Sequence, residues 1–336
     1  MTNLTAVHPF VIYAVVSMAL GGALGWAATK AFPSLPPSSR KLLWAVPLVA
    51  PFALYGGVQA AYGLGLVASC PPLAVPGSWA ESHLVTLCAI GTALARPLAP
   101  LFVLALLAGS LKAAVSLWLA TRLDNGDRAS RQRAGVQRVD AALRALESEF
   151  PALKTRLPRV VVSPRVPGGA FAAGLFRPVI ALSESYLETL DDEELAAVLA
   201  HELAHVEAGD NWKKWLAVTV RDALVFTGFS FAVYRGFDQS MEEAADERAG
   251  AHRSLALAGG IVKACRFRGA GRVREAVLDN FAPSASASSV TARVRRLLDA
   301  AGGHTGPCRL APARAPGAAA GFLVLAVIGL VSLSIC

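Results

Sequence analysis

Four long stretches almost without charged side chains constrain this chain more than any other feature. A helix needs about 20 apolar residues to cross the hydrocarbon core of a bilayer. Residues 9–29, 42–68, 97–120 and 317–336 meet this requirement, with Lys112 the one charge among them. Because 54% of the 336 residues are hydrophobic and only 17% are charged, we expect an integral membrane protein with about four transmembrane helices.

Two of these assignments have alternatives. The limits of the third span are open, because Arg96 could lie inside a helix that begins near Leu84. A cleaved signal peptide is the competing interpretation of the N-terminus, since Ala27 and Ala28 follow an apolar stretch. That stretch is longer than the roughly 7–15 residues of a signal core and no basic segment precedes it, so a retained span is favoured.

The positions of lysine and arginine predict the orientation. Lys30, Arg40 and Lys41 lie between the first two spans, and five arginines lie between residues 122 and 138. Cytoplasmic loops are enriched in these residues, so we expect the N-terminus outside and residues 121–316 in the cytoplasm. The formal charge of +8 then reflects orientation in a lipid bilayer. No nucleic acid partner is expected, because no basic stripe with interleaved aromatic residues occurs.

Five cysteines give no metal-binding pattern, because none of them forms a C-x-x-C pair. Cys70 and Cys88 fall in the predicted exterior loop. A disulfide between them is allowed on that side of the membrane. Cys265, Cys308 and Cys336 are expected to be reduced thiols.

The residue pattern of the expected cytoplasmic region, residues 121–316, predicts one mainly helical domain with a small β-sheet. Apolar residues at helical spacing indicate an amphipathic helix over 136–146. Residues 159–163 and 179–182 are β-rich and predict two strands, separated by a glycine-rich loop at 168–174. The expected fold is therefore membrane α-helical plus α+β, with a membrane region over residues 1–120 and a last span at 317–336.

The best-defined helix covers residues 192–208. Asp191 is an expected N-cap with Glu194 three residues later, as in a capping box, and Gly209 is an expected C-terminal stop.

The segment that follows this helix is apolar over residues 215–234 but contains Arg221 and Asp222. Its uncharged part is too short to span a membrane, so a buried or interface-lying helix is favoured over a fifth crossing. Further helices are expected to contain residues 241–250 and 291–300.

The 192–208 helix carries an H-E-x-x-H motif formed by His201, Glu202 and His205. Residues four apart share one helical face, so both imidazoles can bind one zinc ion while Glu202 accepts a proton from water. The alternative is a helix with two partly exposed histidines and a solvated glutamate. It is disfavoured because the chain has six histidines in all, and two of them fall at this spacing on a capped helix whose residues Leu195, Val198 and Leu199 are apolar.

A catalytic zinc site usually has three protein ligands and an open position. Glu242 is the candidate third ligand, and Asp246, one turn later, could accept the other ring N–H of a ligating histidine. Spacing alone favours Glu242 only slightly over Glu243, and an acidic cluster of this kind can also be a solvated helix face.

The runs at 178–183 and 190–195, the motif with Asp210 after it, and the E-x-x-x-D element at 242–246 resemble the BlaR/MecR-type membrane metallopeptidases. They are also similar to the heat-shock membrane protease HtpX and the CAAX-processing proteases. The resemblance covers about residues 160–300. It implies a gluzincin with one zinc per chain, Glu242 as third ligand and Asp246 as its supporting partner.

The same resemblance implies that residues 173–182 lie near the cleft and pair with substrate as an added strand. One departure is expected, because the penicillin-binding sensor domain of those proteins has no counterpart in this sequence. Ser38 and Lys41 fit an S-x-x-K pattern but lie in a short loop, so we interpret the match as coincidence and do not expect β-lactam sensing.

The expected function is zinc-dependent cleavage of a cytosolic or membrane protein in regulated proteolysis or signalling, with a sensor or regulator protein as a further partner. The alternatives are membrane-protein quality control, an intramembrane protease and a non-catalytic zinc-stabilised scaffold. The charged run at 191–194 disfavours the intramembrane site, and Glu202 disfavours the scaffold. His252 is a candidate oxyanion stabiliser or an ordinary surface residue. Family and composition suggest a bacterial inner membrane.

Overall fold

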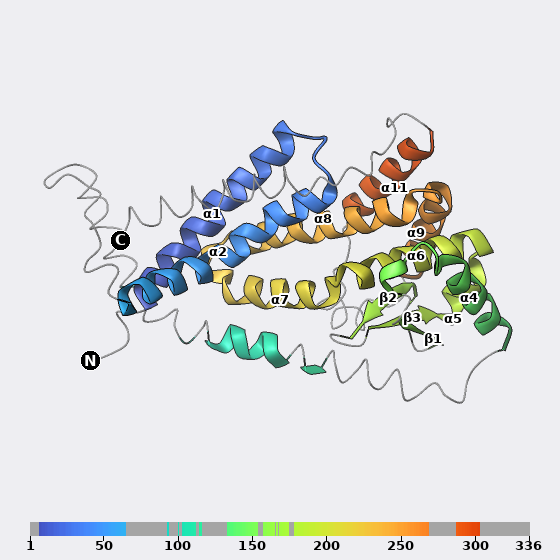
Figure 1. Ribbon diagram of the computed structural model, residues 1–336, viewed down its shortest axis with the longest axis horizontal. Helices are drawn as coiled ribbons and strands as arrows, with labels where there is room; N and C mark the ends of the chain where they lie inside the picture. The colour runs from blue at the N-terminus through green and yellow to red at the C-terminus, as the bar shows by residue number, and fades with distance from the viewer. Residues whose placement is uncertain are drawn as a thin grey trace, which may run out of the picture. The chain divides into compact units, whose positions relative to one another are not determined.

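The computed structural model describes two compact units (Figure 1). The described residues are 7–64, 93, 100, 103–111, 114–115, 133–153, 157–164, 166, 168–174, 178–268 and 287–302. Half of the predicted third span, the loop with Cys70 and Cys88, and the whole predicted fourth span lie outside these ranges.

The first unit comprises residues 1–110, 216–240 and 312–336. Helices α1 (Val7–Ala31) and α2 (Pro37–Gly63) match the first two predicted spans. Within the described ranges they are the two helices that are long and apolar enough to cross a membrane. The second begins earlier than predicted, at Pro37, because the fixed φ of proline suits the first turn of a helix. The chain therefore has the features of a membrane protein.

A tryptophan side chain joins the helices of this unit. The ring of Trp44 on α2 lies against Gly25 of α1, where a Cβ atom would be 3.3 Å from the ring. The same ring covers Gly236 so closely that a Cβ atom there would overlap it. Two glycines thus create the space that lets three helices approach one indole ring.

The predicted single helix over 215–234 is wrong. The structure divides this segment among α7 (Asp210–Ala223), the short 3₁₀ helix η2 (Val225–Thr227) and α8 (Ser230–Gly250). Gly228 at the turn has a φ of 74°, a conformation that glycine adopts without strain. The continuous apolar pattern of the sequence conceals this turn.

The second unit comprises residues 111–215 and 241–311. Helix α4 (Arg133–Leu146) ends before Pro151 as predicted. The unit also contains α5 (Glu184–Thr189), α6 (Asp192–Ala208), α9 (Ser254–Arg268) and α11 (Ala287–Ala301). Helix α6 is the centre of its core and packs on α4, α9 and the sheet. Two of these helices, α5 and α9, were not predicted.

The small sheet has three strands in the order β1-β3-β2. Strand β1 (Arg159–Ser163) is parallel to β3 (Val179–Ser183), and β2 (Ala170–Ala173) is antiparallel to β3. The sequence predicted the first and third strands but placed β2 in a glycine-rich loop. Alanine has little strand preference, so pairing with β3 stabilises β2 more than its own residues do.

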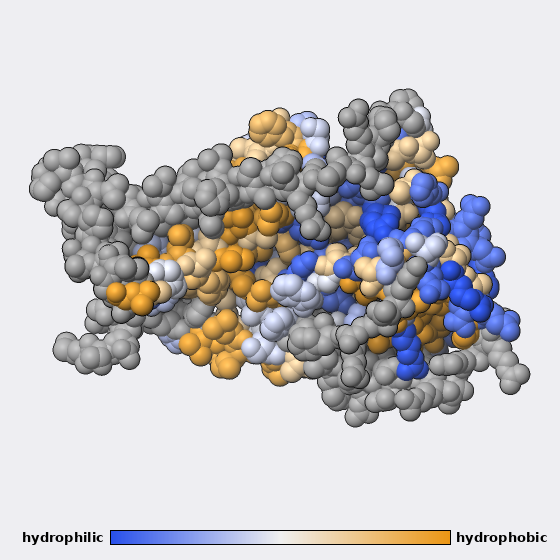
Figure 2. Space-filling view, in the orientation of Figure 1, coloured by the Kyte–Doolittle hydropathy of each residue, from blue (hydrophilic) through white to orange (hydrophobic). Residues whose placement is uncertain are grey.

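Surface hydropathy differs between the two units. Hydrophobic side chains gather over the α1 and α2 helices of the first unit, whereas hydrophilic side chains surround the α4, α6 and α9 helices of the second (Figure 2). Fully buried side chains in the second unit, such as Leu195, Leu199 and Leu203 on α6, provide the packing that holds α6 in place.

Candidate metal centre

Helix α6 begins and ends where the sequence predicts. The Asp191 carboxylate accepts from the Glu194 amide at 2.8 Å, and the Glu194 carboxylate accepts from the Asp191 amide at 3.0 Å. Gly209 closes the helix in the left-handed conformation, with φ 64°. Because both ends are fixed by local hydrogen bonds, the side chains in the third and fourth turns have defined directions.

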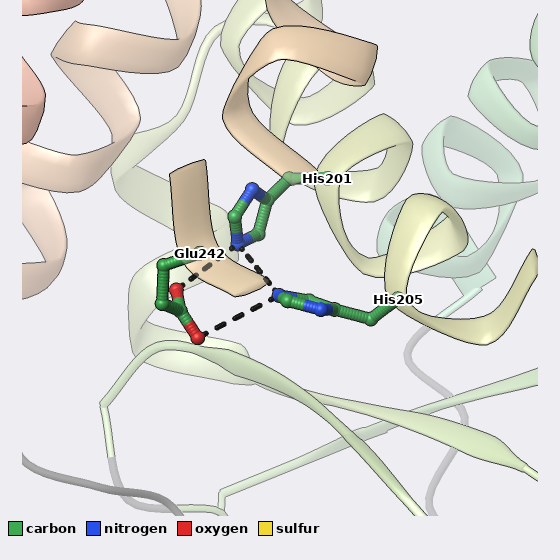
Figure 3. Close-up of side chains that lie close together, drawn as sticks. All are labelled: His201, His205 and Glu242. Atoms are coloured by element: carbon green, nitrogen blue, oxygen red, sulfur yellow. Dashed lines mark hydrogen bonds and ion pairs between the residues drawn. The ribbon is translucent and has the colours of Figure 1, made fainter. Parts of the chain in front are cut away.

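Two imidazoles on α6 and one carboxylate on α8 surround a single point (Figure 3). The Nε2 atoms of His201 and His205 are 3.2 Å apart. The carboxylate oxygens of Glu242 lie 3.6 Å from the first of these atoms and 3.7 Å from the second. Their side chains are 10%, 12% and 20% exposed, so the group is largely shielded from solvent.

These separations suit a zinc ion. Zinc bonds of 2.0–2.1 Å in a tetrahedron place neighbouring ligand atoms about 3.3 Å apart. His201, His205 and Glu242 each have one possible ligand atom within 4.8 Å of those of the other two. Among the described residues, these three form the group of His, Cys, Asp or Glu side chains that could hold a metal ion. The three residue types are also those that zinc prefers in catalytic sites.

The structure separates Glu242 from Glu243, which spacing alone hardly distinguished. Glu243 is 6% exposed and its carboxylate lies 2.7 Å from Arg296 on α11. It therefore faces away from the imidazoles, and Glu242 is the neighbour that points at them.

Each imidazole has a carboxylate behind it. Asp246 Oδ1 lies 3.2 Å from His201 Nδ1, and Asp210 Oδ2 lies 3.0 Å from His205 Nδ1. The Asp210 contact is a hydrogen bond, which orients the His205 ring with Nε2 toward the centre, whereas Asp246 contacts His201 as an ion pair. The structure brings Asp246 next to His201, and it also brings Asp210, the first residue of α7, next to His205, a contact that the sequence did not predict.

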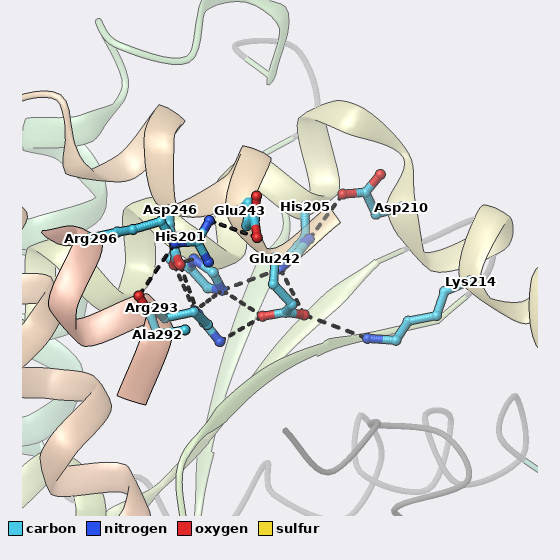
Figure 4. Close-up of polar contacts among 10 residues, drawn as sticks. All are labelled: His201, His205, Asp210, Lys214, Glu242, Glu243, Asp246, Ala292, Arg293 and Arg296. Carbon is cyan, nitrogen blue, oxygen red and sulfur yellow. Dashed lines mark hydrogen bonds and ion pairs between the residues drawn. The ribbon is translucent and has the colours of Figure 1, made fainter. Parts of the chain in front are cut away.

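A buried arginine completes the cluster (Figure 4). Arg293 on α11 donates to Asp246 at 2.6 and 2.7 Å and to Glu242 at 2.9 Å. Its Nη2 atom lies 3.5 Å from Nε2 of His201. The sequence predicted only a basic helix here, because nothing in its pattern distinguishes Arg293 from its neighbours Arg295 and Arg296.

A second cation approaches from α7. Lys214 Nζ lies 3.6 Å from Oε1 of Glu242, opposite the guanidinium of Arg293 (Figure 4). The two positive side chains partly balance the carboxylates around the imidazoles.

The electrostatics of the cluster favour charged carboxylates. Burial would raise the pKa of Glu242, but Arg293 and His201 hold that pKa well below its usual range. Burial would lower the pKa of His201, but Asp246 and Glu242 raise it to about 9. A histidine must be neutral to bind a metal, so metal binding at this site displaces a proton.

Glu202 and His252 occupy different surroundings. Glu202 is 7% exposed on α6, and its charge contributes to raising the pKa of Arg293. His252 is exposed in the turn after α8, ten residues beyond Glu242 and roughly 15 Å farther at the rise of a helix. The structure therefore brings Glu202 near the cluster but does not bring His252 there.

The end of β2 is tied to the same region. The Asn211 side chain on α7 donates to the carbonyl of Gly174 at 3.0 Å, and β2 packs on α6. Part of the predicted cleft segment 173–182 thus lies beside the helix that carries both imidazoles.

Comparison with known proteins identifies the family. The family model described as Peptidase family M48 matches residues 131–314, more than half of the 336 residues. A protease HtpX homolog from Desulfatibacillum aliphaticivorans is 40% identical over 72 residues, which are 21% of this chain and 23% of that protein. One from Salinibacter ruber is 34% identical over 82 residues, 24% of this chain and 29% of that protein.

A third protease HtpX homolog, from Bordetella pertussis, is 51% identical over 43 residues, 12% of this chain and 15% of that protein. The chain spans less than a third of the length of each of these curated relatives. No solved structure matches. The predicted resemblance is confirmed at the level of the family, whereas a BlaR/MecR-type specificity stays a prediction. With its candidate metal-binding cluster inside the matched residues, the chain belongs to peptidase family M48.

Proposed function

We propose that this chain is a membrane-embedded zinc endopeptidase that hydrolyses peptide bonds in membrane or cytosolic proteins. One observation supports this most directly. His201, His205 and Glu242 point at one centre, and Glu202 follows His201 in the chain at the position of a general base. Bound there, zinc would supply the Lewis acidity that activates water and polarises a peptide carbonyl.

The chain's own residues provide the proton transfers and the orientation. Glu202 accepts a proton from the attacking water and later delivers it to the leaving amine. Asp246 and Asp210 hold the imidazole rings in place through the Nδ1 atoms.

Arg293 is the candidate stabiliser of the oxyanion, the role for which the sequence suggested His252. Its guanidinium lies 3.5 Å from Nε2 of His201, beside the centre of the cluster, and it carries a fixed positive charge. A preorganised cation in a water-poor site stabilises negative charge that develops on a carbonyl oxygen.

We further propose that the substrate binds as an extended segment along β2. The strand order β1-β3-β2 leaves the outer edge of β2 unpaired within the described sheet. A peptide added at such an edge forms main-chain hydrogen bonds that are independent of its sequence. This mode suits a peptidase that acts on protein chains.

Two uses of the activity differ in the number of targets. Regulated proteolysis with a sensor partner would cleave one or a few proteins, whereas quality control would cleave many. The curated relatives are homologues of protease HtpX, which favours quality control at a bacterial inner membrane.

The test is zinc content and proteolysis of the full chain reconstituted in lipid vesicles with membrane proteins. Glu202→Gln removes the general base and should retain about one zinc per chain but lose cleavage by a factor of at least about 10². The matched control is Glu193→Gln, an exposed glutamate on the same helix, which should cleave as the wild type does.

Other outcomes have definite meanings. A wild type that binds no zinc would contradict the metal centre. A wild type that binds zinc and cleaves no offered protein would favour the scaffold. Fragments from many substrates would indicate quality control, and fragments from one or two would indicate regulated cleavage.

A further inference from the structure

The turn between α7 and α8 exposes apolar side chains. Val225, Phe229 and Phe231 are 51%, 48% and 53% exposed, whereas the polar Thr227 and Ser230 between them are 6% and 0% exposed. A turn that faces water normally has the opposite arrangement, with polar side chains outside. All of these residues belong to the first unit.

The two charges of this segment neutralise each other inside the hairpin. Residues 216–234 contain one cation and one anion. Arg221 Nη2 lies 2.7 Å from Asp222 Oδ1, and the two side chains are 12% and 15% exposed. The guanidinium also lies 4.9 Å from the ring of Phe231 and 4.8 Å from that of Tyr234. A partly buried ion pair of this kind tolerates apolar surroundings far better than a lone charge does.

Four backbone amides of the turn have hydrogen-bond partners within this segment. The amides of Leu224, Thr227 and Gly228 donate to carbonyls of the preceding turn at 2.9–3.1 Å. The Phe229 amide donates to the Thr227 hydroxyl at 3.4 Å, and that hydroxyl donates to the Leu224 carbonyl at 2.8 Å. Each amide that has a partner inside the protein avoids the cost of an unsatisfied backbone group in lipid.

The hairpin lies beside a helix that can span a membrane. The 3₁₀ helix η2 packs against α1. A Cβ atom at Gly22, near the middle of the apolar helix Phe10–Ala31, would lie 3.1 Å from Val233. If α1 crosses the bilayer, the start of α8 is at the depth of the acyl chains.

From these observations we propose that the α7–α8 turn is a re-entrant membrane hairpin whose exposed face, formed by Val225, Phe229 and Phe231, contacts lipid acyl chains. The eight residues from Leu216 to Ala223 rise roughly 12 Å, less than half of a hydrocarbon core about 30 Å thick. The hairpin therefore enters and leaves on one side. A single charge at Arg221 or Asp222 would disfavour placing this segment in the membrane. The ion pair between the two side chains removes most of this cost.

Site-specific quenching tests this proposal in the full chain. A cysteine-free background carries a single cysteine at Phe229 or, as a second position, at Val225. Each cysteine is labelled with a small fluorophore in detergent and the protein is then reconstituted in phosphatidylcholine vesicles. The matched control is a cysteine at Leu255, an apolar residue of α9 that is 64% exposed in the second unit.

The expected result is several-fold stronger quenching by lipids with a nitroxide on the acyl chain at 225 and 229 than at 255, with the reverse order for aqueous iodide. Quenching by iodide at 225 and 229 would place the turn in water and overturn the proposal. Protection from both quenchers would show a protein partner or second copy on this face, which also overturns it. Glu202→Gln should give the same pattern, so the result is separate from peptidase activity.

Discussion

At the scale of single residues, Arg293 is the side chain on which the charge balance of the cluster depends most. It is 11% exposed and contacts the carboxylates of both Glu242 and Asp246. Removing one partner of a buried ion pair leaves the other charges uncompensated, which costs about 3–5 kcal/mol.

We therefore predict that Arg293→Met lowers the stability of the zinc-free protein by about 3 kcal/mol or more. Bound zinc compensates the same carboxylates, so the loss should be smaller in the zinc-loaded protein. Thermal unfolding in detergent, with and without zinc, measures both. Arg295→Met on the same helix is the control. An equal loss in both forms would show that Arg293 acts by packing alone.

A second prediction concerns acid stability. Glu149 accepts two hydrogen bonds from Arg253, at 2.6 and 2.8 Å. These bonds, opposed by partial burial, lower the pKa of Glu149 below its usual value. The folded pKa is depressed, so the stabilisation is present above the ordinary pKa of about 4.5 and is lost as the pH falls through the lowered value.

Glu149→Gln should therefore lower the melting temperature at pH 6 and narrow its difference from the wild type as the pH falls below about 4. Melting curves across that range test this. The control is Glu147→Gln, two residues away and exposed. Its melting temperature should change with pH as that of the wild type does. A constant difference for the Glu149 variant would contradict the linkage.

Sequence reasoning identified the residues of the motif but not their supporting cations. The i, i+4 spacing of His201 and His205 is a local property of one helix, so the sequence reveals it. Arg293 is 92 positions after His201, and only tertiary packing selects it. The choice between Glu242 and Glu243 likewise depended on which face of α8 meets α6.

At the scale of secondary-structure elements, the contact of Trp44 with two glycines holds three helices together. A side chain at Gly236 would overlap the indole ring. Overpacking of a close contact costs about 1–3 kcal/mol.

Gly236→Ala is predicted to lower stability in this range, and a second change, Trp44→Leu, should recover part of the loss because it removes the overlapping ring. Thermal unfolding of the two single variants and the double variant tests the coupling. Gly57→Ala on α2, where no atom lies within 4 Å of an added Cβ, is the control. Additive effects would show that the ring and Gly236 do not interact.

Helices and strands were predicted correctly where the residues that determine them are close together in the chain. Helix α6 was predicted to its terminal residues, because its capping box and Gly209 are adjacent in the chain. Strand β2 was missed, because Ala170–Ala173 is extended only through its pairing with β3. The turn at Gly228 was missed, because hydrophobic periodicity continues across it.

At the scale of the whole molecule, zinc should contribute directly to stability. Its ligands come from α6 and α8, 37 positions apart at the nearest, and a ligand that binds only the folded state stabilises it by about 2.7 kcal/mol at a hundredfold excess over Kd. Chelation should therefore lower the melting temperature of the full chain, and added zinc should restore it. His205→Ala should abolish this response. A shift that persists in this variant would place the metal elsewhere.

The part of the overall organisation that could be predicted from the sequence is the pair of N-terminal membrane helices, because composition alone determines them. The first two spans follow from uncharged runs, and α1 and α2 match them. The N-terminus-outside orientation, the cytoplasmic placement of the peptidase unit and the fourth span stay predictions, because they depend on residues or a bilayer outside the described structure.

The position of Arg293 also has a consequence for biosynthesis. The centre needs side chains from residue 201 to residue 293, so it is incomplete while the chain is still being made. At about 5–20 residues per second, translation from the first imidazole to the arginine takes roughly 5–18 s. During this interval a nascent chain has the helix that carries both imidazoles but lacks the cation of α11. The ion pairs of Arg293 with Glu242 and Asp246 therefore form only after α11 has been translated.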